Sequence, residues 1–213
     1  KAVVVTHLWG VPADMDPILK VCGELGIPVI EDVSHAQGSK YKGAHCGTVG
    51  DIGAFSLQGS KAIVAGEGGF MLTNSKRYFQ RAQVPGHHGA RLSSEMSIKE
   101  VKPFAQGGGA WTYRMFPVAA AIATAQLEKL ATMNAARQAN FDRLRTHLKK
   151  VPFIRWPRLH RGSMRGWYGT PAIFDAGMAP VGRDTFVKAC AAEGVGISGE
   201  GYQDWSQIPL FQD

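Results

Sequence analysis

The chain has 213 residues, of which 45% are hydrophobic and 19% charged, a globular composition that excludes disorder and low-complexity architecture. Its 24 Lys and Arg outnumber its 17 Asp and Glu, and the net charge of +7 suits an anionic partner without choosing among phosphates, nucleotides and nucleic acid. No apolar run reaches the ~20 residues of a membrane span, and no secretory leader is visible. Three scattered cysteines without a CxxC pair favour a reducing cytoplasm over a disulfide framework.

The first third of the sequence predicts a βαβ unit. Residues 2–6 are a β-branched run, which is typical of a buried parallel strand. Asp16 followed by Pro17 predicts the start of a helix, Gly26 predicts its end, and residues 27–31 predict the next strand. Because the chain lacks an initial Met and enters a strand at once, we expect it to be part of a longer protein.

The next segment predicts the rest of a sheet. Residues 52–57 and 70–73 are expected to be strands, and residues 75–83 a short helix. Residues 84–110 are polar and end near Gly107–Gly109, so we expect a long loop, a kind of segment that is often functional. His87–His88 lies in this loop, where it either faces a substrate or is a plain loop pair.

A long helix follows, with a different texture after it. Pro117 is expected to open a helix that extends to Lys150 and carries an apolar stripe. Strand-like runs at 167–174 and 195–197 flank a helix predicted over 185–193. The stripe is formed by Leu127, Leu130, Phe141, Leu144 and Leu148.

These elements predict an α/β fold. We expect a three-layer α/β/α architecture with a mainly parallel sheet, over residues 1–135, and a smaller α+β domain over residues 136–213 that includes the end of the long helix.

Chemistry-bearing residues concentrate between residues 31 and 69. Asp32 follows one predicted strand, Ser56 ends the next, and Lys61 lies in a Gly-rich loop at the same edge. In open α/β sheets ligands bind at the carboxyl edge, so a carboxylate, a hydroxyl and an amine are expected to converge there. Pyridoxal phosphate requires such a set: a lysine to attach it, a carboxylate to keep its ring nitrogen protonated, and small donors for its phosphate.

Each of these residues has a plain interpretation when it is taken alone. An Asp after a strand is commonly a turn or cap residue, a lone loop Lys is a solvated charge, and Gly66-Glu67-Gly68-Gly69 is a turn. The ordered set of residues therefore carries the cofactor hypothesis.

The same residues belong to longer motifs, and with them almost the whole chain resembles the DegT/DnrJ/StrS family of sugar aminotransferases, which have the fold type I architecture. The motifs are His7-Leu8-Trp9-Gly10 with Pro12, Asp14 and Met15; Glu31 to Ala36; Tyr41-Lys42-Gly43; Gly50-Asp51; Phe55-Ser56; Lys61; Gly66 to Gly69; Tyr113-Arg114-Met115 with Ala119-Ala120 and Gln126-Leu127; Gly201-Tyr202; and Ile208 to Phe211.

The resemblance implies a role for individual residues. Lys61 would attach pyridoxal phosphate and Asp32 would pair with its ring nitrogen, which makes these two the catalytic residues. His35 would contact the cofactor ring or its phenolic oxygen, and Ser56 would bind the phosphate, with Gln58 as a weaker candidate nearby. Thr112 stands where relatives often have an Asn that reaches the phosphate of the partner subunit's cofactor.

The resemblance also implies an activity. An amino group would pass from Glu or Gln to a keto group on a nucleotide-linked sugar or a cyclitol, in a homodimer joined near residues 111–130. Related dehydratases resemble this chain but have His in place of Lys61, so Lys61 favours transamination. The alternative is a truncated, non-catalytic remnant that acts as a folded or partner-dependent domain.

Other features allow several interpretations. Residues 137–165 are strongly basic and form either a solvated face, a surface that attracts a nucleotide diphosphate, or a nucleic-acid surface, which no recognition motif supports. Trp156, Trp167 and Tyr168 are interpreted as packing residues. His45-Cys46 lacks a second ligand pair at metal-binding spacing, so no metal is expected.

Overall fold

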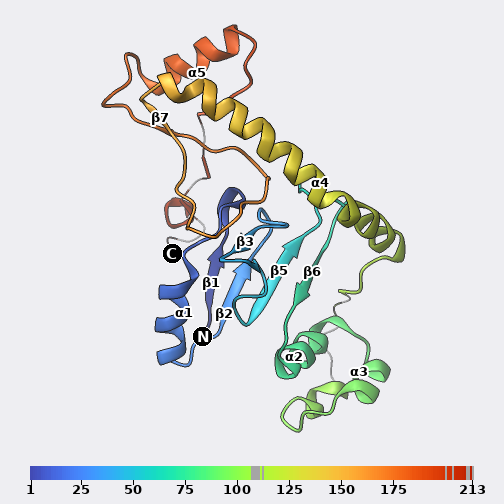
Figure 1. The fold of residues 1–213 in the computed structure, drawn as a ribbon. Helices are drawn as coiled ribbons and strands as arrows, with labels where there is room; N and C mark the ends of the chain where they lie inside the picture. Colours follow the sequence, from blue (N-terminus) through green and yellow to red (C-terminus); the bar gives the residue numbers. More distant parts are fainter. Residues whose placement is uncertain (107–110, 112, 200, 203, 210–211, 213) are drawn as a thin grey trace. The chain divides into compact units, whose positions relative to one another are not determined.

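The structure is a computed structural model that describes residues 1–106, 111, 113–199, 201–202, 204–209 and 212. Its main sheet has the strand order β1-β2-β5-β6 (Figure 1). β1, β2 and β5 are parallel, and β6 is antiparallel to β5, so the predicted α/β class with a mainly parallel sheet is confirmed. The strands are β1 (Val3–Thr6), β2 (Val29–Asp32), β5 (Ile52–Ser56) and β6 (Gly69–Leu72).

The register of the sheet aligns the carboxyl ends of its parallel strands. Thr6 of β1 pairs with Asp32 of β2, and Asp32 pairs with Ala54 of β5. Ser56 follows Ala54 by two residues and is the last residue of β5. Asp32 and Ser56 therefore leave the sheet at one edge, where parallel α/β sheets bind ligands.

Helix α1 (Met15–Glu24) crosses over from β1 to β2. Its buried side chains Met15 and Cys22 pack in one apolar cluster with Val5, Val29 and Val33 of the sheet and its loops. Burial of side chains of this size is worth roughly 1.5–3 kcal/mol each, so this cluster fixes the helix on the sheet. The helix ends, as predicted, before a glycine with positive φ.

The start of α1 corrects the sequence prediction, because its N-cap residue is Asp14 and not Asp16. The hydroxyl of Tyr41 donates to Asp14 Oδ1 at 2.8 Å and accepts from the backbone N–H of Asp16 at 3.2 Å. The tyrosine hydroxyl thus takes the hydrogen bond that a capping carboxylate would take, and the helix begins two residues earlier than Asp16-Pro17 predicts. Tyr41 comes from a small hairpin of β3 (Lys40–Tyr41) and β4 (Ala44–His45).

The predicted loop 84–110 contains helical structure. Helix α2 (Lys76–Gly86) is longer than expected, and it is followed by α3 (Gly89–Glu95) and the 3-10 helix η2 (Lys102–Gln106). The amide of Gln80 is buried and bonds to Glu95, Ser97 and Ile98, so polar residues hold this segment together. An apolar pattern gives no signal for such a core. Gly107–Gly109 lies outside the described residues.

The long helix is confirmed as α4 (Pro117–His147), continued by the 3-10 helix η3 (Leu148–Lys150). The predicted apolar stripe is only partly buried. Leu130 and Phe141 are buried, whereas Leu127 is 59% exposed and Leu144 is 42% exposed. Leu130 packs against the loop after β5, together with Ala119 and Ala123 of the same helix.

The described chain forms two compact units. The first comprises residues 1–145 and 157–171, and the second comprises residues 146–156 and 172–213. The domain boundary at residue 135 falls inside α4 and stays a prediction. No helix in the described part of the chain is both long enough and apolar enough to cross a membrane.

The second unit is small and is organised by aromatic residues. Strands β7 (Ile154–Arg155) and β8 (Ile173–Phe174) pair antiparallel, and helix α5 (Arg183–Ala192) follows. The rings of Phe153, Phe174 and Phe186 lie 5.5–5.7 Å apart between centroids. The strand predicted over 167–174 is confirmed only at its end, and residues 195–197 are not a strand. A 3-10 helix η4 (Trp205–Gln207) lies near the end of the chain.

Candidate active site

Asp32 is fixed at the carboxyl edge of the sheet. Its Oδ1 accepts a hydrogen bond from the backbone N–H of Ser34 at 3.0 Å, and its Oδ2 accepts one from the hydroxyl of Thr6 at 3.5 Å. Its backbone carbonyl accepts from the N–H of His7 at 3.0 Å. Ser34, two residues on, and Thr6 of the neighbouring strand therefore orient the carboxylate of Asp32.

His35 lies in the turn after β2 and is buried. Its ring stacks on that of Tyr168, with 3.8 Å between centroids and 9° between planes. Burial lowers the pKa of His35, the positive charge of Lys61 lowers it further, and the negative charge of Asp32 opposes the shift. The imidazole is therefore neutral at neutral pH. His35 and Lys61 both contact the ring of Tyr168, and Asp32 lies three residues before His35 at the end of β2.

Lys61 extends from the loop between β5 and β6. Its Nζ lies 4.5 Å from the centroid of the Tyr168 ring, a cation–π contact. The backbone N–H of Lys61 donates to the carbonyl of Gln58 at 2.9 Å. The hydroxyl of Ser60, the residue before Lys61, lies 3.5 Å from the Tyr168 hydroxyl. Tyr168 therefore contacts both the predicted lysine and the predicted histidine.

Ser56 and Gln58 lie on the approach to Lys61. Ser56 Oγ accepts from the backbone N–H of Gln58 at 3.3 Å, which leaves its own hydroxyl hydrogen able to donate. Gln58 Oε1 accepts from the backbone N–H and the hydroxyl of Ser60, at 2.9 and 2.6 Å. The side chain of Gln58 therefore shapes the loop that carries Lys61. Thr112 lies outside the described residues.

Gln37 is a supporting residue that the sequence prediction missed. Its side chain is buried, its Nε2 donates to the carbonyl of Ser56, and its Oε1 accepts from the N–H of Ile63 at 2.7 Å. Its own carbonyl accepts from Asn134 of α4 at 3.2 Å. Gln37 thus joins the end of β5 and the loop after Lys61 through its side-chain amide, and the long helix through its backbone carbonyl.

Tyr168 is a second missed residue, since the sequence led us to interpret it as packing. The backbone N–H of Gly166 anchors its segment by donating to the carbonyl of Gly10 at 2.9 Å and to Ser39 Oγ at 2.7 Å. Gly10 has φ +82°, and a Cβ there would lie 2.2 Å from the carbonyl oxygen of Gly166. Two backbones meet closely here, and only glycine permits the approach. The contact joins segments more than a hundred residues apart, so no local pattern predicts it.

His87 and His88 lie at the junction of α2 and α3, as C-cap and N-cap residues. Burial, followed by the charge of Arg91, lowers the pKa of His87. A substrate-facing role for the pair stays a prediction.

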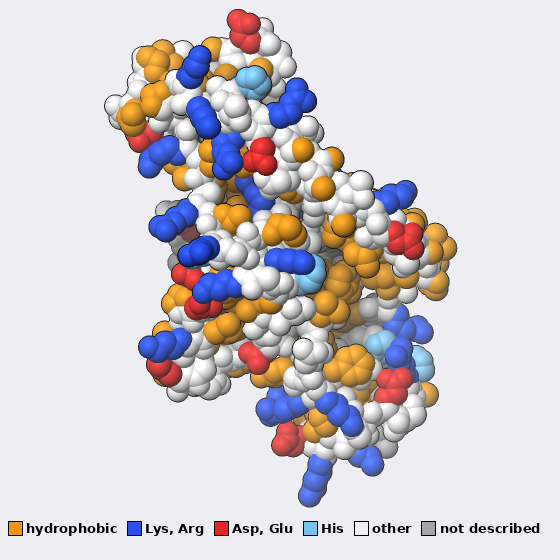
Figure 2. Space-filling model, viewed as in Figure 1, with side chains coloured by type: hydrophobic (Ala, Val, Ile, Leu, Met, Phe, Trp, Pro, Cys, Tyr) orange, Lys and Arg blue, Asp and Glu red, His pale blue; other side chains and the backbone are white. Residues whose placement is uncertain are grey.

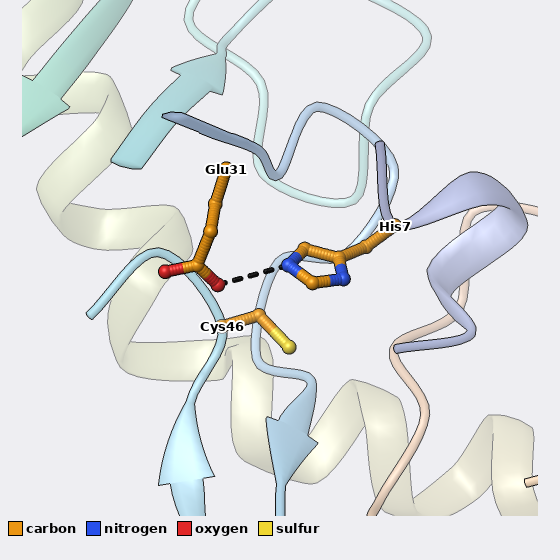
Figure 3. A group of neighbouring side chains, drawn as sticks. All are labelled: His7, Glu31 and Cys46. Carbon is orange, nitrogen blue, oxygen red and sulfur yellow. Dashed lines mark hydrogen bonds and ion pairs between the residues drawn. The ribbon is translucent and has the colours of Figure 1, made fainter. Parts of the chain in front are cut away.

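His7, Glu31 and Cys46 form a separate polar cluster (Figure 3). Its potential ligand atoms lie within 4.8 Å of one another, which is the spacing of a metal site. His7 Nε2 and Glu31 Oε2 are 2.9 Å apart, and His7 Nδ1 accepts from the N–H of Ala13 at 3.0 Å. The proton of the ring is therefore on Nε2, where it is donated to Glu31.

The carboxylate and the thiol of this cluster are also accounted for. Glu31 accepts three further backbone hydrogen bonds, from Gly47 at 2.8 Å, Val49 at 2.7 Å and Gly50 at 2.6 Å. Burial raises the pKa of the Cys46 thiol to about 12, with a further contribution from the negative charge of Glu31. A metal would have to displace these bonds and deprotonate this thiol, so the cluster is chemically suited to a structural hydrogen-bond network. The three cysteines are free, and the predicted cytoplasmic location stays a prediction.

A known protein family matches this chain along its whole length, and individual relatives match most of it. The sequence pattern of the DegT/DnrJ/EryC1/StrS aminotransferase family matches residues 1–213. The protein MosB of Rhizobium meliloti is 34% identical over 177 residues, which is 79% of this chain and 34% of that protein. A protein of Micromonospora echinospora, proposed to be an L-glutamine:3-amino-2,3-dideoxy-scyllo-inosose aminotransferase, is 30% identical over 207 residues, which is 93% of this chain and 47% of that protein.

Solved structures agree on the fold. The aminotransferase TlmJ from Streptoalloteichus hindustanus superposes with a TM-score of 0.79 at 28% identity, over 99% of this chain and 55% of its own. An aminotransferase from Psychrobacter cryohalolentis superposes with a TM-score of 0.79 at 26% identity, over 91% of this chain and 52% of its own. The fold type I architecture is thereby confirmed. The chain spans about half the length, or less, of the proteins it matches.

Proposed function

Because the chain belongs to the DegT/DnrJ/EryC1/StrS aminotransferase family, whose enzymes depend on pyridoxal phosphate, we propose that it carries the cofactor site of a sugar or cyclitol aminotransferase. The amino group passes from Glu or Gln to a keto group on a nucleotide-linked sugar or a cyclitol. The observation that carries the proposal is that Lys61 and His35 both contact the Tyr168 ring, beside the strand end that holds Asp32. The name of the Micromonospora echinospora relative supports glutamine as donor and a cyclitol as acceptor.

The residues present fit this cofactor. When bound, pyridoxal phosphate supplies an electron sink for the carbanion formed at the substrate carbon. The site offers a carboxylate fixed at the end of β2, a lysine on the neighbouring loop and a flat stacked pair of rings. Gly66, in the same loop, has φ +86° and open space where a Cβ would stand, so backbone there can approach a phosphate.

Asp32 and His35 hold the ring. The carboxylate of Asp32 pairs with the ring nitrogen and keeps it protonated, since two hydrogen bonds hold the carboxylate in place. The neutral imidazole of His35 is suited to a hydrogen bond with the phenolic oxygen and cannot repel the protonated ring.

Lys61 holds the cofactor and moves the proton. Its Nζ reaches the site across the face of Tyr168, which limits where the amine can go. With the cofactor bound, Nζ would be the base that accepts the proton from Cα of the amino donor, a general-base role worth about 10²–10⁴ in rate. The presence of lysine at this position favours transamination over dehydration.

Ser56, Gln58 and Thr112 complete the proposal for the phosphate. The hydroxyl of Ser56 is a donor at the end of β5, and the amide of Gln58 lies two residues on. Thr112 is proposed to donate to the cofactor phosphate of the partner subunit.

A homodimer is part of the proposal. Hydrophobic side chains gather over the N-terminal part of α4 (Figure 2). Exposed apolar surface of this kind marks protein contacts. Ile122→Glu is therefore expected to shift sedimentation velocity towards the monomer, whereas Glu24→Gln, at an exposed position of α1, is expected to leave it unchanged. An unaltered dimer in Ile122→Glu would refute this surface as the contact. The exposed members are Trp111, Tyr113, Phe116, Val118, Ile122 and Leu127.

The function is tested by amino transfer from L-glutamine or L-glutamate to scyllo-inosose or a keto-sugar nucleotide, followed by product mass. Lys61→Ala is expected to lose at least about a hundredfold in rate, and Lys20→Ala, on the exposed side of α1, is expected to retain the wild-type rate. Activity near wild type in Lys61→Ala would contradict the assignment. A wild-type protein that binds the cofactor but aminates none of these acceptors would favour the non-catalytic alternative.

A further inference from the structure

A pocket of about 290 Å³ lies on the first unit, beside the Tyr168 ring. It is called the α4 pocket here, and it is lined by Arg137, Asn140, Phe141 and Leu144 of α4 and by residues 167–170. One water occupies ~30 Å³ in the liquid, so the pocket has room for a small organic molecule. Tyr168 belongs to its wall and also contacts Lys61 and His35. Tyr168 is therefore shared by the wall of the pocket and the candidate active site.

The polar groups of the α4 pocket are suited to an anion. Arg137 Nη1 is buried, and no described residue accepts a hydrogen bond from it. Asn140 and Thr170 add an amide and a hydroxyl that can donate. None of the described lining residues is acidic. A buried donor without an acceptor is unfavourable, and a carboxylate or phosphate oxygen would satisfy this one.

A second cation, Arg165, contacts two aromatic rings that line the pocket, those of Phe141 and Trp167. Arg165 is buried, and its guanidinium carbon lies 4.2 Å from the Trp167 ring centroid and 5.2 Å from that of Phe141. Its Nη2 donates to the carbonyls of Trp9 and Gly169. The ion pairs of the described residues include neither Arg137 nor Arg165. Arg137 thus lines the pocket, and Arg165 contacts two of its aromatic rings, without a carboxylate partner for either arginine among these ion pairs.

We propose that the α4 pocket is the subsite that holds the anionic end of a substrate, with Arg137 as its anchor. The proposal rests on the function proposed above, since the reacting end of that substrate must reach Lys61. A molecule seated against Tyr168 has its anionic group at Arg137 and its other end on the Lys61 side of the ring. The apolar floor of Phe141, Leu144 and Trp167 covers the carbon chain between them.

Two substrates of the proposed reaction carry such a group. The amino donor has carboxylates, and a nucleotide-linked acceptor has a diphosphate. Both present charged oxygens to a guanidinium fork, so the pocket chemistry is the same for both. Two unreactive probes distinguish the two candidate substrates: glutarate represents the amino donor, and inorganic pyrophosphate represents the nucleotide-linked acceptor.

The experiment is isothermal titration of the cofactor-loaded protein with each probe. For the probe that the pocket recognises, Arg137→Gln is expected to raise Kd roughly tenfold, because a charge-assisted pair is lost. Arg143→Gln removes the same charge from an exposed position of the same helix and is expected to leave Kd within twofold. Leu144→Trp fills the pocket from a position that is 42% exposed, and is also expected to weaken binding. It keeps the test valid if Arg137→Gln does not fold.

The outcomes separate the subsite from the function. Weakened glutarate binding assigns the pocket to the amino donor, and weakened pyrophosphate binding assigns it to the acceptor. Unchanged binding of both probes in Arg137→Gln and Leu144→Trp, equal weakening in Arg143→Gln, or no binding by the wild type would overturn the subsite. Covalent trapping of the cofactor on Lys61 is expected to be unchanged in Arg137→Gln. A failure of trapping in the wild type refutes the proposed function, and titration of the cofactor-free protein and the same variants with glutarate then tests the anion site by itself.

Discussion

The hydrogen-bond network of Glu31 makes a sharp prediction about stability. The two carboxylate oxygens accept four hydrogen bonds, from His7 and three backbone N–H groups. Glu31→Gln replaces one oxygen with an NH₂ group of nearly the same size. Two buried donors then face a donor, and each unmade bond costs about 1–3 kcal/mol. We therefore expect the free energy of unfolding to fall by about 2–6 kcal/mol.

Urea unfolding at pH 7, followed by circular dichroism, measures this change. The matched control is Glu24→Gln, the same substitution at an exposed position at the end of α1, which is expected to stay within about 0.5 kcal/mol of wild type. A loss below 1 kcal/mol in Glu31→Gln would refute the reasoning, because it would mean that the four bonds do not depend on the carboxylate.

The same carboxylate predicts a pH dependence. Burial opposes ionisation of Glu31, but hydrogen bonds from His7, Gly47, Gly50 and Val49 outweigh it and hold its pKa below the usual value. A group whose pKa is lower in the folded state contributes stability that is complete above its unfolded pKa of ~4.3 and is lost as pH falls through the folded pKa. The stability difference between wild type and Glu31→Gln should therefore narrow below about pH 4. A constant difference down to pH 2 would contradict the shift.

Two further predictions concern packing and thiol reactivity. Gly53→Ala places a Cβ 2.3 Å from a backbone carbonyl oxygen and should lower the free energy of unfolding by about 1–3 kcal/mol in the same assay. Gly23→Ala, in open space within α1, should raise the free energy of unfolding by about 0.5–1 kcal/mol. Equal effects of the two substitutions would contradict the packing. Cys46, whose pKa is about 12, should resist iodoacetamide in the native protein at pH 8 while the half-buried Cys190 reacts, as read by peptide mass; rapid labelling of Cys46 would disagree with its burial.

The sheet and its ligand edge could be predicted because their signals are local. A β-branched run marks β1, and the order strand, helix, strand forces β1 and β2 to be parallel. Asp32 and Ser56 then had to end neighbouring strands at one edge. Lys61 followed from its place in the next loop and from the family motif.

The residues that complete the site could not be predicted, because they come from distant segments. Tyr168 reaches Lys61 through a backbone contact between Gly10 and Gly166. Gln37 acts through its amide, which has no periodic signature. The same reason explains the wrong helix start, since the Tyr41 hydroxyl that selects Asp14 comes from a hairpin beyond the helix.

The helical structure within 84–110 was missed on different grounds. Its small core is held by the buried amide of Gln80, and its apolar residues are Leu92, Met96, Val101 and Ala105. These are too few and too widely spaced to outweigh the polar composition of the segment in a periodicity argument. Prediction failed in this segment because a buried polar side chain, with only a few apolar residues, organises its backbone.

The most direct measurement is borohydride reduction of the purified protein after addition of pyridoxal phosphate, followed by peptide mapping. The proposed site predicts one pyridoxyl adduct, on Lys61, that is abolished in Lys61→Ala and retained in Lys20→Ala. An adduct spread over surface lysines, or none on Lys61, would contradict the claim that Asp32, His35 and Lys61 form the cofactor site.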